Sequence, residues 1–121
     1  MKMLLIVVLA LAPVPATAQN WVGLLKNTPA ERFDEEDLRL FMDNSRKALA
    51  EGKVGETSSW ENPKTRARGD ITVLRVFESK GRSCREVRVR NQAQGRKGDN
   101  TFNLCQVDGK WRLLSASQLK K

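Results

Sequence analysis

The chain has 121 residues, which is room for one domain and too few for two. Its 22 Lys and Arg residues outnumber 14 Asp and Glu, and the formal net charge of +8 favours acidic partners such as nucleic acid, anionic lipid or lipopolysaccharide. The sequence contains no His, and its two Cys lack the Cys-x-x-Cys spacing, so a zinc or redox pair is disfavoured.

Residues 1–18 have the pattern of a secretory signal peptide. Lys2 provides a basic start, residues 3–11 form an apolar run too short to span a bilayer, and Ala-Thr-Ala at 16–18 fits a signal-peptidase site. We expect cleavage after residue 18 and export to the periplasm of a Gram-negative bacterium. An uncleaved membrane anchor is disfavoured because prolines interrupt the apolar run. No Cys lies near the site for lipid attachment, so we expect no transmembrane segment or lipid anchor in the mature protein.

Residues 19–33 are interpreted as a leader followed by a short helical turn. The leader contains four apolar side chains that are available to pack on the domain: Trp21, Val22, Leu24 and Leu25. Thr28, Pro29 and Glu31 then fit an N-cap, a first-turn proline and the Glu of a capping box. The pattern therefore predicts that a helical turn begins after Thr28.

The main helix is expected to run from about Asp34 to a C-cap at Gly52. Acidic residues at 35–37 favour the positive end of the helix dipole, and we expect them to form a solvated first turn. A cation site is disfavoured because the EF-hand spacing and its Gly are absent. The side chains of one helical face should pack on the core: Leu38, Phe41, Met42, Ser45, Ala48 and Leu49.

The alternating pattern after Gly52 predicts strands. A loop over 55–70 with a short strand near 58–61 is followed by strands at 71–78, 84–90, 101–107 and 110–116. The connections are residues 79–82, residues 91–100 and the Asp108-Gly109 pair, which favours a type I′ hairpin turn. The fold class predicted is α+β: one amphipathic helix on a curved antiparallel sheet of four to five strands. This single domain spans 34–116, and residues 117–121 form a basic tail.

Export favours a disulfide between Cys84 and Cys105. If these two residues are directly opposed, the register agrees with the expected hairpins and separates the sheet into two faces. The face expected to receive the helix contains Leu74, Val76, Val87, Val89, Phe102, Leu104, Trp111 and Leu113.

The opposite face carries the disulfide and mixes apolar residues with cations. Its apolar members are Ile71, Val73, Phe77 and Leu114. Its candidate anion-binding or partner-binding residues are Arg75, Arg88, Arg90, Lys110 and Arg112, and Arg96 and Lys97 extend the set. Two interpretations stay open. The face is either solvated, with cross-strand pairs such as Arg75 and Glu86, or it binds phosphate or carboxylate through bidentate guanidinium groups.

Catalysis is not expected, because neither a nucleophile elbow nor a phosphate-binding loop is present. Glu56 with Glu61 or Asp70 is the one conceivable acid pair, and stray loop acids explain it better. We expect no catalytic residues, metal or cofactor. Nucleic acid is a disfavoured partner, because one helix followed by consecutive hairpins is not the RRM order and the RNP aromatic motif is missing.

Trp60-Glu61-Asn62-Pro63, followed by Gly69, the Gly81–Arg85 stretch, Cys105 and the Asp108–Trp111 stretch, resembles the C-terminal domain of the rickettsial outer-membrane surface antigen family. The resemblance covers about residues 59–113. It implies a non-enzymatic cell-envelope protein and supplies no catalytic residues. Members commonly carry a lipidated N-terminal Cys and a glycine-rich hydrophobic segment. Neither is found here, so we expect a soluble periplasmic form, with outer-membrane association as the further possibility.

Structural roles can be assigned to the matched residues. Trp60 should cover one end of the core, with ligand stacking as the alternative, and Asn62 with Pro63 should shape a turn. Asp108 and Gly109 should fix the last hairpin, before Trp111.

The function expected is a structural or binding role in the cell envelope. Contact with an anionic envelope component or an envelope protein would be made through the basic sheet face. The alternative is a periplasmic accessory module of a secretion or envelope-assembly complex. The sequence does not predict the oligomeric state.

Overall fold

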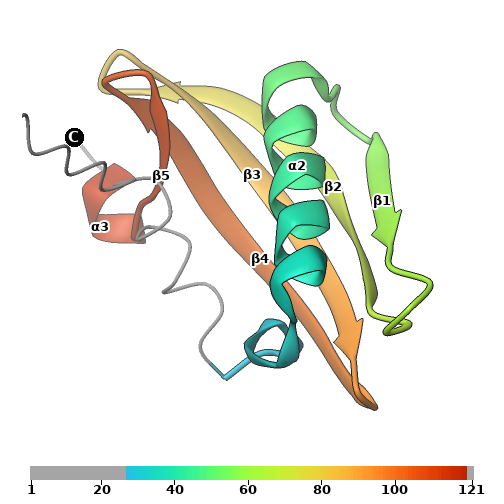
Figure 1. Ribbon diagram of the computed structural model, residues 1–121. Helices are drawn as coiled ribbons and strands as arrows, with labels where there is room; N and C mark the ends of the chain where they lie inside the picture. The colour runs from blue at the N-terminus through green and yellow to red at the C-terminus, as the bar shows by residue number, and fades with distance from the viewer. Residues whose placement is uncertain (1–26, 120–121) are drawn as a thin grey trace, which may run out of the picture.

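The computed structural model describes residues 27–119, so the predicted signal peptide, most of the leader and the last two residues of the basic tail lie outside the described part. Five strands form one antiparallel sheet in the order β1-β2-β3-β4-β5, and a helix crosses one face (Figure 1). The elements are η1 (Pro29–Arg32), α2 (Glu35–Glu51), β1 (Thr57–Glu61), β2 (Arg68–Ser79), β3 (Arg82–Ala93), β4 (Arg96–Val107), β5 (Lys110–Leu113) and α3 (Ala116–Leu119). The predicted α+β class is confirmed. None of the helices among the described residues is long and apolar enough to cross a membrane.

Both N-terminal helical segments begin near the predicted positions, η1 after Thr28 and α2 after Asp34. The Thr28 hydroxyl accepts a hydrogen bond from the Ala30 amide at 3.2 Å. Asp34 and Asp37 form a reciprocal capping box, in which the Asp37 amide donates to Asp34 at 2.7 Å and the Asp34 amide donates to Asp37 at 3.0 Å. The helix ends at Gly52, whose amide donates to the Ala48 carbonyl at 2.8 Å. These bonds satisfy backbone groups that a helix end leaves unpaired.

The prediction of a solvated acidic first turn is wrong for Asp37, which is 1% exposed. Its Oδ1 accepts hydrogen bonds from Asn62 Nδ2 and from the Thr65 hydroxyl, each at 2.7 Å. Burial alone would raise the pKa of Asp37, but bonds from Thr65, Asp34 and Asn62 together lower it. The buried carboxylate therefore ties the start of α2 to the loop that follows β1.

Three two-residue turns connect the long strands: Lys80-Gly81, Gln94-Gly95 and Asp108-Gly109. Both residues of each turn have positive φ, between 50° and 79°, as type I′ turns require. The predicted connection over 91–100 is wrong, because β3 and β4 stay paired to Ala93 and Arg96. Residues 91–100 are almost all polar, so they carry no hydrophobic alternation from which a strand could be predicted.

The predicted register around the disulfide is confirmed, since Cys84 lies opposite Cys105 and the two are bonded. It fails in β2, where a bulge between Val73 and Arg75 places Val73, not Leu74, opposite Val87. Ile71 and Val73 therefore join the core, against the prediction. Three side chains predicted for the core are instead exposed: Leu74, Val76 and Leu113.

The core lies between α2 and the sheet. Phe41, Ala48 and Leu49 of α2 pack with buried sheet residues, among them Val87 and Leu104. A second cluster, on the reverse face of the sheet, surrounds the disulfide with Leu114, Phe77 and Leu119. The last strand ends at Leu113, three residues before the predicted boundary, and α3 covers this second cluster. The Ser79 hydroxyl donates to the Leu119 carbonyl at 2.7 Å.

We predict that Asp37→Asn destabilises the fold by about 1–3 kcal/mol at pH 7, because an amide nitrogen cannot accept the Asp34 amide bond. The folded protein lowers the pKa of Asp37, so its carboxylate contributes stability above the unfolded value of roughly 3.9. That contribution is lost as the pH falls through the folded pKa. Urea unfolding from pH 7 to pH 2.5 should show the gap between wild type and variant closing. Asp43→Asn, an exposed change on the same helix, is the control, and an unchanged gap would contradict the prediction.

We predict that reducing the Cys84–Cys105 disulfide costs about 3 kcal/mol, the chain-entropy value for a loop closed over 21 residues. The measurement is chemical unfolding with and without a phosphine reductant. The Cys84→Ala, Cys105→Ala double variant should match the reduced protein and show no response to the reductant. Equal stability of oxidised and reduced protein would contradict the prediction.

Candidate functional site

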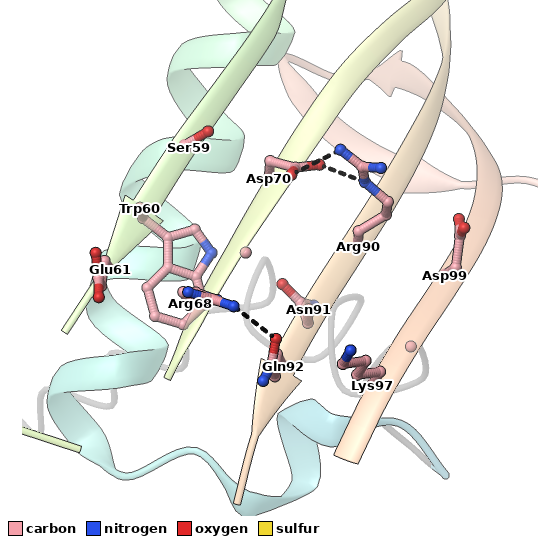
Figure 2. A pocket seen from close by; sticks show the side chains of 12 residues that line it. Ser59, Trp60, Glu61, Arg68, Asp70, Arg90, Asn91, Gln92, Lys97 and Asp99 are labelled. Carbon is pink, nitrogen blue, oxygen red and sulfur yellow. Dashed lines mark hydrogen bonds and ion pairs between the residues drawn. The ribbon is translucent and has the colours of Figure 1, made fainter. Parts of the chain in front are cut away.

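An open groove of about 710 Å³ crosses β1 to β4 on the reverse face, the face turned away from α2 (Figure 2). Side chains alternate along a strand, so two rows on the reverse face border the groove. One row contains Ser59, Asp70, Arg90 and Asp99, and the other contains Glu61, Arg68, Gln92 and Lys97. The row between them consists of Trp60, Gly69, Asn91 and Gly98.

Glycine in this middle row permits close packing across the strands. A Cβ at Gly69 would lie 2.7 Å from the Arg90 carbonyl oxygen and 2.8 Å from Trp60 Nε1, and it would overlap Asn91 Oδ1. At Gly98 a Cβ would lie 2.6 Å from Pro29 Cδ. Any larger residue at Gly69 would therefore displace Trp60 or separate the strands.

Bidentate ion pairs occupy one border of the groove. Arg90 Nε and Nη2 each donate a hydrogen bond to one carboxylate oxygen of Asp70, both at 3.0 Å (Figure 2). Arg88, beside the groove, bonds Asp99 in the same way, with Nε donating at 2.8 Å. This hydrogen bond lowers the pKa of Asp99, and the carboxylates raise the pKa of both arginines. The pairs are about half exposed, so they position side chains more than they stabilise the fold.

The second border contains two cations that form no ion pair among the described residues. Arg68 Nη2 donates to Gln92 Oε1 at 3.2 Å, and no ion pair involves Arg68 or Lys97 within residues 27–119. Asn91 Oδ1 is buried on the helix side of the sheet, behind the groove, and has no hydrogen-bond partner within residues 27–119. The carboxylate of Glu61 lines the same border. A ligand would therefore meet two cations and one carboxylate.

The structure divides the five candidate cations between two places. Arg88 and Arg90 lie at the groove. The guanidinium of Arg75 donates to Glu86 Oε1 at 3.3 Å and stacks on Phe77 at 4.0 Å from the ring centre. Arg112 lies opposite Cys105 and its Nε is buried without a partner, and Lys110 is exposed on the same short strand. These three belong to the end of the sheet that carries the disulfide.

Sequence reasoning missed Arg68 and Gln92, because both lie in segments interpreted as loops. The Gln94-Gly95 pair was the available signal, since a two-residue turn there places Gln92 opposite Lys97. Of the conceivable catalytic acids, Glu61 and Asp70 line the groove, and Asp70 is paired with Arg90. Glu56 instead accepts the Lys53 amide bond at 2.9 Å. Within residues 27–119 no cluster of His, Cys, Asp and Glu is suited to hold a metal ion.

The residues of the sequence motif pack in the core and form the turn after β1. Trp60 is 7% exposed and packs edge-on against Phe33 and Phe41, so it is a core residue as predicted. Asn62 makes a tight turn. Its Oδ1 accepts the Lys64 amide bond, and its backbone bonds Arg66 and Ala67. Pro63 follows within this turn, and Trp111 packs partly buried against the core under the Arg85 guanidinium.

The sequence model of the 17 kDa outer membrane surface antigen family matches residues 47–112. The chain is 31% identical over 84 residues to the 17 kDa surface antigen of Rickettsia prowazekii (strain Madrid E), which covers 68% of this chain and 53% of that protein. The proteins of the same description from Rickettsia conorii and Rickettsia rickettsii are 31% identical over 85 residues, covering 69% and 54%. The chain thus spans about half the length of the curated relatives it matches. Comparison with solved structures gave no match.

We predict that Gly69→Ala destabilises the protein by about 1–3 kcal/mol, because the new methyl overlaps Asn91 and crowds Trp60. The check is urea unfolding followed by tryptophan emission, with the native emission shifted because the Trp60 environment changes. Ser59→Ala, on the exposed border of the same groove, should leave both readouts unchanged. A wild-type unfolding midpoint for Gly69→Ala would show that the row is not tightly packed.

Proposed function

Because the chain belongs to the 17 kDa outer membrane surface antigen family, we propose that it is a non-enzymatic, exported protein of the bacterial cell envelope that binds an anionic envelope glycan along the reverse-face groove. The family description supports an envelope location. The signal-peptide pattern of residues 1–18 supports export.

One observation carries the binding proposal: Arg68 and Lys97 border the groove and form no ion pair within the described residues, while Arg88 and Arg90 are paired. An unpaired guanidinium can take a phosphate or carboxylate in bidentate geometry, and a lysine adds a mobile charge. The net positive charge of the whole chain attracts a polyanion to this face.

The shape of the groove supports a chain-like ligand. It crosses four strands, which are spaced by about 4.8 Å, so it extends across about 14 Å of the sheet. Its polar border also offers Gln92 and Ser59. Such a mixture suits a phosphorylated or uronic-acid polysaccharide, which presents hydroxyl groups beside its charges.

The decisive experiment removes the two unpaired cations. Arg68→Gln with Lys97→Gln should weaken binding to lipopolysaccharide about tenfold or more and reduce retention on isolated envelope fractions. Arg39→Gln with Arg46→Gln removes the same charge from the exposed face of α2 and is the matched control. Equal loss in both variants would indicate a response to net charge alone and would reject the groove.

Whole-cell crosslinking tests the alternative accessory role. A single protein partner at fixed stoichiometry would favour a module of a secretion or envelope-assembly complex, whereas polysaccharide adducts support the glycan proposal.

We predict that Asp70→Asn strengthens binding to the same lipopolysaccharide by several fold, because it releases the Arg90 guanidinium into the groove. Asp43→Asn makes the same charge change on α2 and should have little effect. Titration at low and moderate salt checks both variants, and the gain should shrink as salt screens the charges. Weaker binding by Asp70→Asn would mean that the ligand requires the intact ion pair or avoids Arg90.

A further inference from the structure

The helix side of the sheet is only partly covered by the described residues. Helix α2 packs chiefly on β1 and β2, and η1 packs on β3 and β4 (Figure 1). Toward the Lys80-Gly81 and Asp108-Gly109 turns, apolar side chains remain exposed: 41% for Leu74, 47% for Val76 and 37% for Leu113. Together with the half-buried Trp111, these residues form what we call the uncovered patch.

One row of residues connects the two ends of the uncovered patch. Val76 lies opposite Arg85, Arg85 opposite Leu104, and Leu104 opposite Leu113, so this row crosses four strands on one face. Its centre, Leu104, is 2% exposed and belongs to the main core. The guanidinium of Arg85 is held over Trp111, at 5.3 Å from the ring centre. Exposed apolar side chains at the ends of such a row normally pack against another layer.

The chain enters the described structure close to this patch and on the same face. Pro29 contacts the Gly98 position, and Thr28 lines a small cavity with Asn100 and Phe102. Phe102 precedes Leu104 by two residues on the same side of β4, which is a distance of about 7 Å. The segment directly before Asn27 therefore begins within one or two side-chain rows of the patch.

We propose that residues 19–26 of this same chain cover the uncovered patch. Their sequence, Gln-Asn-Trp-Val-Gly-Leu-Leu-Lys, supplies four large apolar side chains and a single charge. Eight residues can span up to about 27 Å, whereas the far end of the patch, at the level of Trp111, is about 14 Å beyond Phe102. Burial of these side chains against Leu74, Val76 and Leu113 would complete the second layer of the fold over β3, β4 and β5.

Photocrosslinking in the exported protein tests this occupant directly. Val76→p-benzoylphenylalanine places the probe on an exposed position of the patch, and Val54→p-benzoylphenylalanine, at a position that is 62% exposed outside it, is the control. The expected product at position 76 has the mass of a monomer and joins the probe to a peptide containing residues 19–26. The control should give no such product.

Two results would overturn the proposal. A crosslinked dimer at low micromolar protein would identify a second copy as the occupant. Crosslinking at position 76 no greater than at position 54 would leave the patch open to solvent. As a second readout, Leu24→Ser with Leu25→Ser should lower the melting temperature by roughly 5 °C or more and abolish the monomeric product. An unchanged melting temperature would also contradict the proposal, and none of these results depends on glycan binding.

Discussion

The buried Asp37 carboxylate is the interaction on which the arrangement of helix and sheet depends. It accepts a hydrogen bond from the Asp34 amide at the N-terminus of α2, and it also accepts hydrogen bonds from Asn62 and Thr65 after β1. A buried charge is tolerated only when all its bonds are made, so helix, turn and edge strand must assemble together. The turn after β1 also sets the position of Trp60. The Trp60 ring fills part of the core, and its Nε1 lies close to Gly69. Trp60, Asn62 and Gly69 thereby act as one structural unit.

That unit determines the reverse face as well. The close row of Trp60, Gly69, Asn91 and Gly98 brings four strands together, and the side chains on either side of it become the borders of the groove. The strand register then decides which cations of the reverse face lie next to a carboxylate. Carboxylates from neighbouring strands neutralise Arg88 and Arg90, while Arg68 and Lys97 form no ion pair in the part of the chain that the structure describes.

The opposite end of the sheet is organised by different chemistry. The disulfide fixes β3 against β4 and lies under α3 with Leu114 and Leu119, which forms a small second core. The bulge at Leu74 separates the two regions, because it moves Ile71 and Val73 beneath α2 and leaves Val76 on the uncovered patch. A single sheet thus carries a main core, a disulfide cluster, a polar groove and an apolar surface, each on its own part of the two faces.

The sequence by itself determined the α+β class, the approximate start of α2 and its C-cap, the last hairpin and the pairing of Cys84 with Cys105. These features depend on neighbouring residues, such as an N-cap, an Asp-Gly turn or the period of a strand. Only the tertiary structure decided the burial of Asp37, the bulge at Leu74, the strands over 91–100 and the cations left unpaired at the groove. Each of these depends on partners distant in the chain, whose positions shift when one extra residue enters a strand.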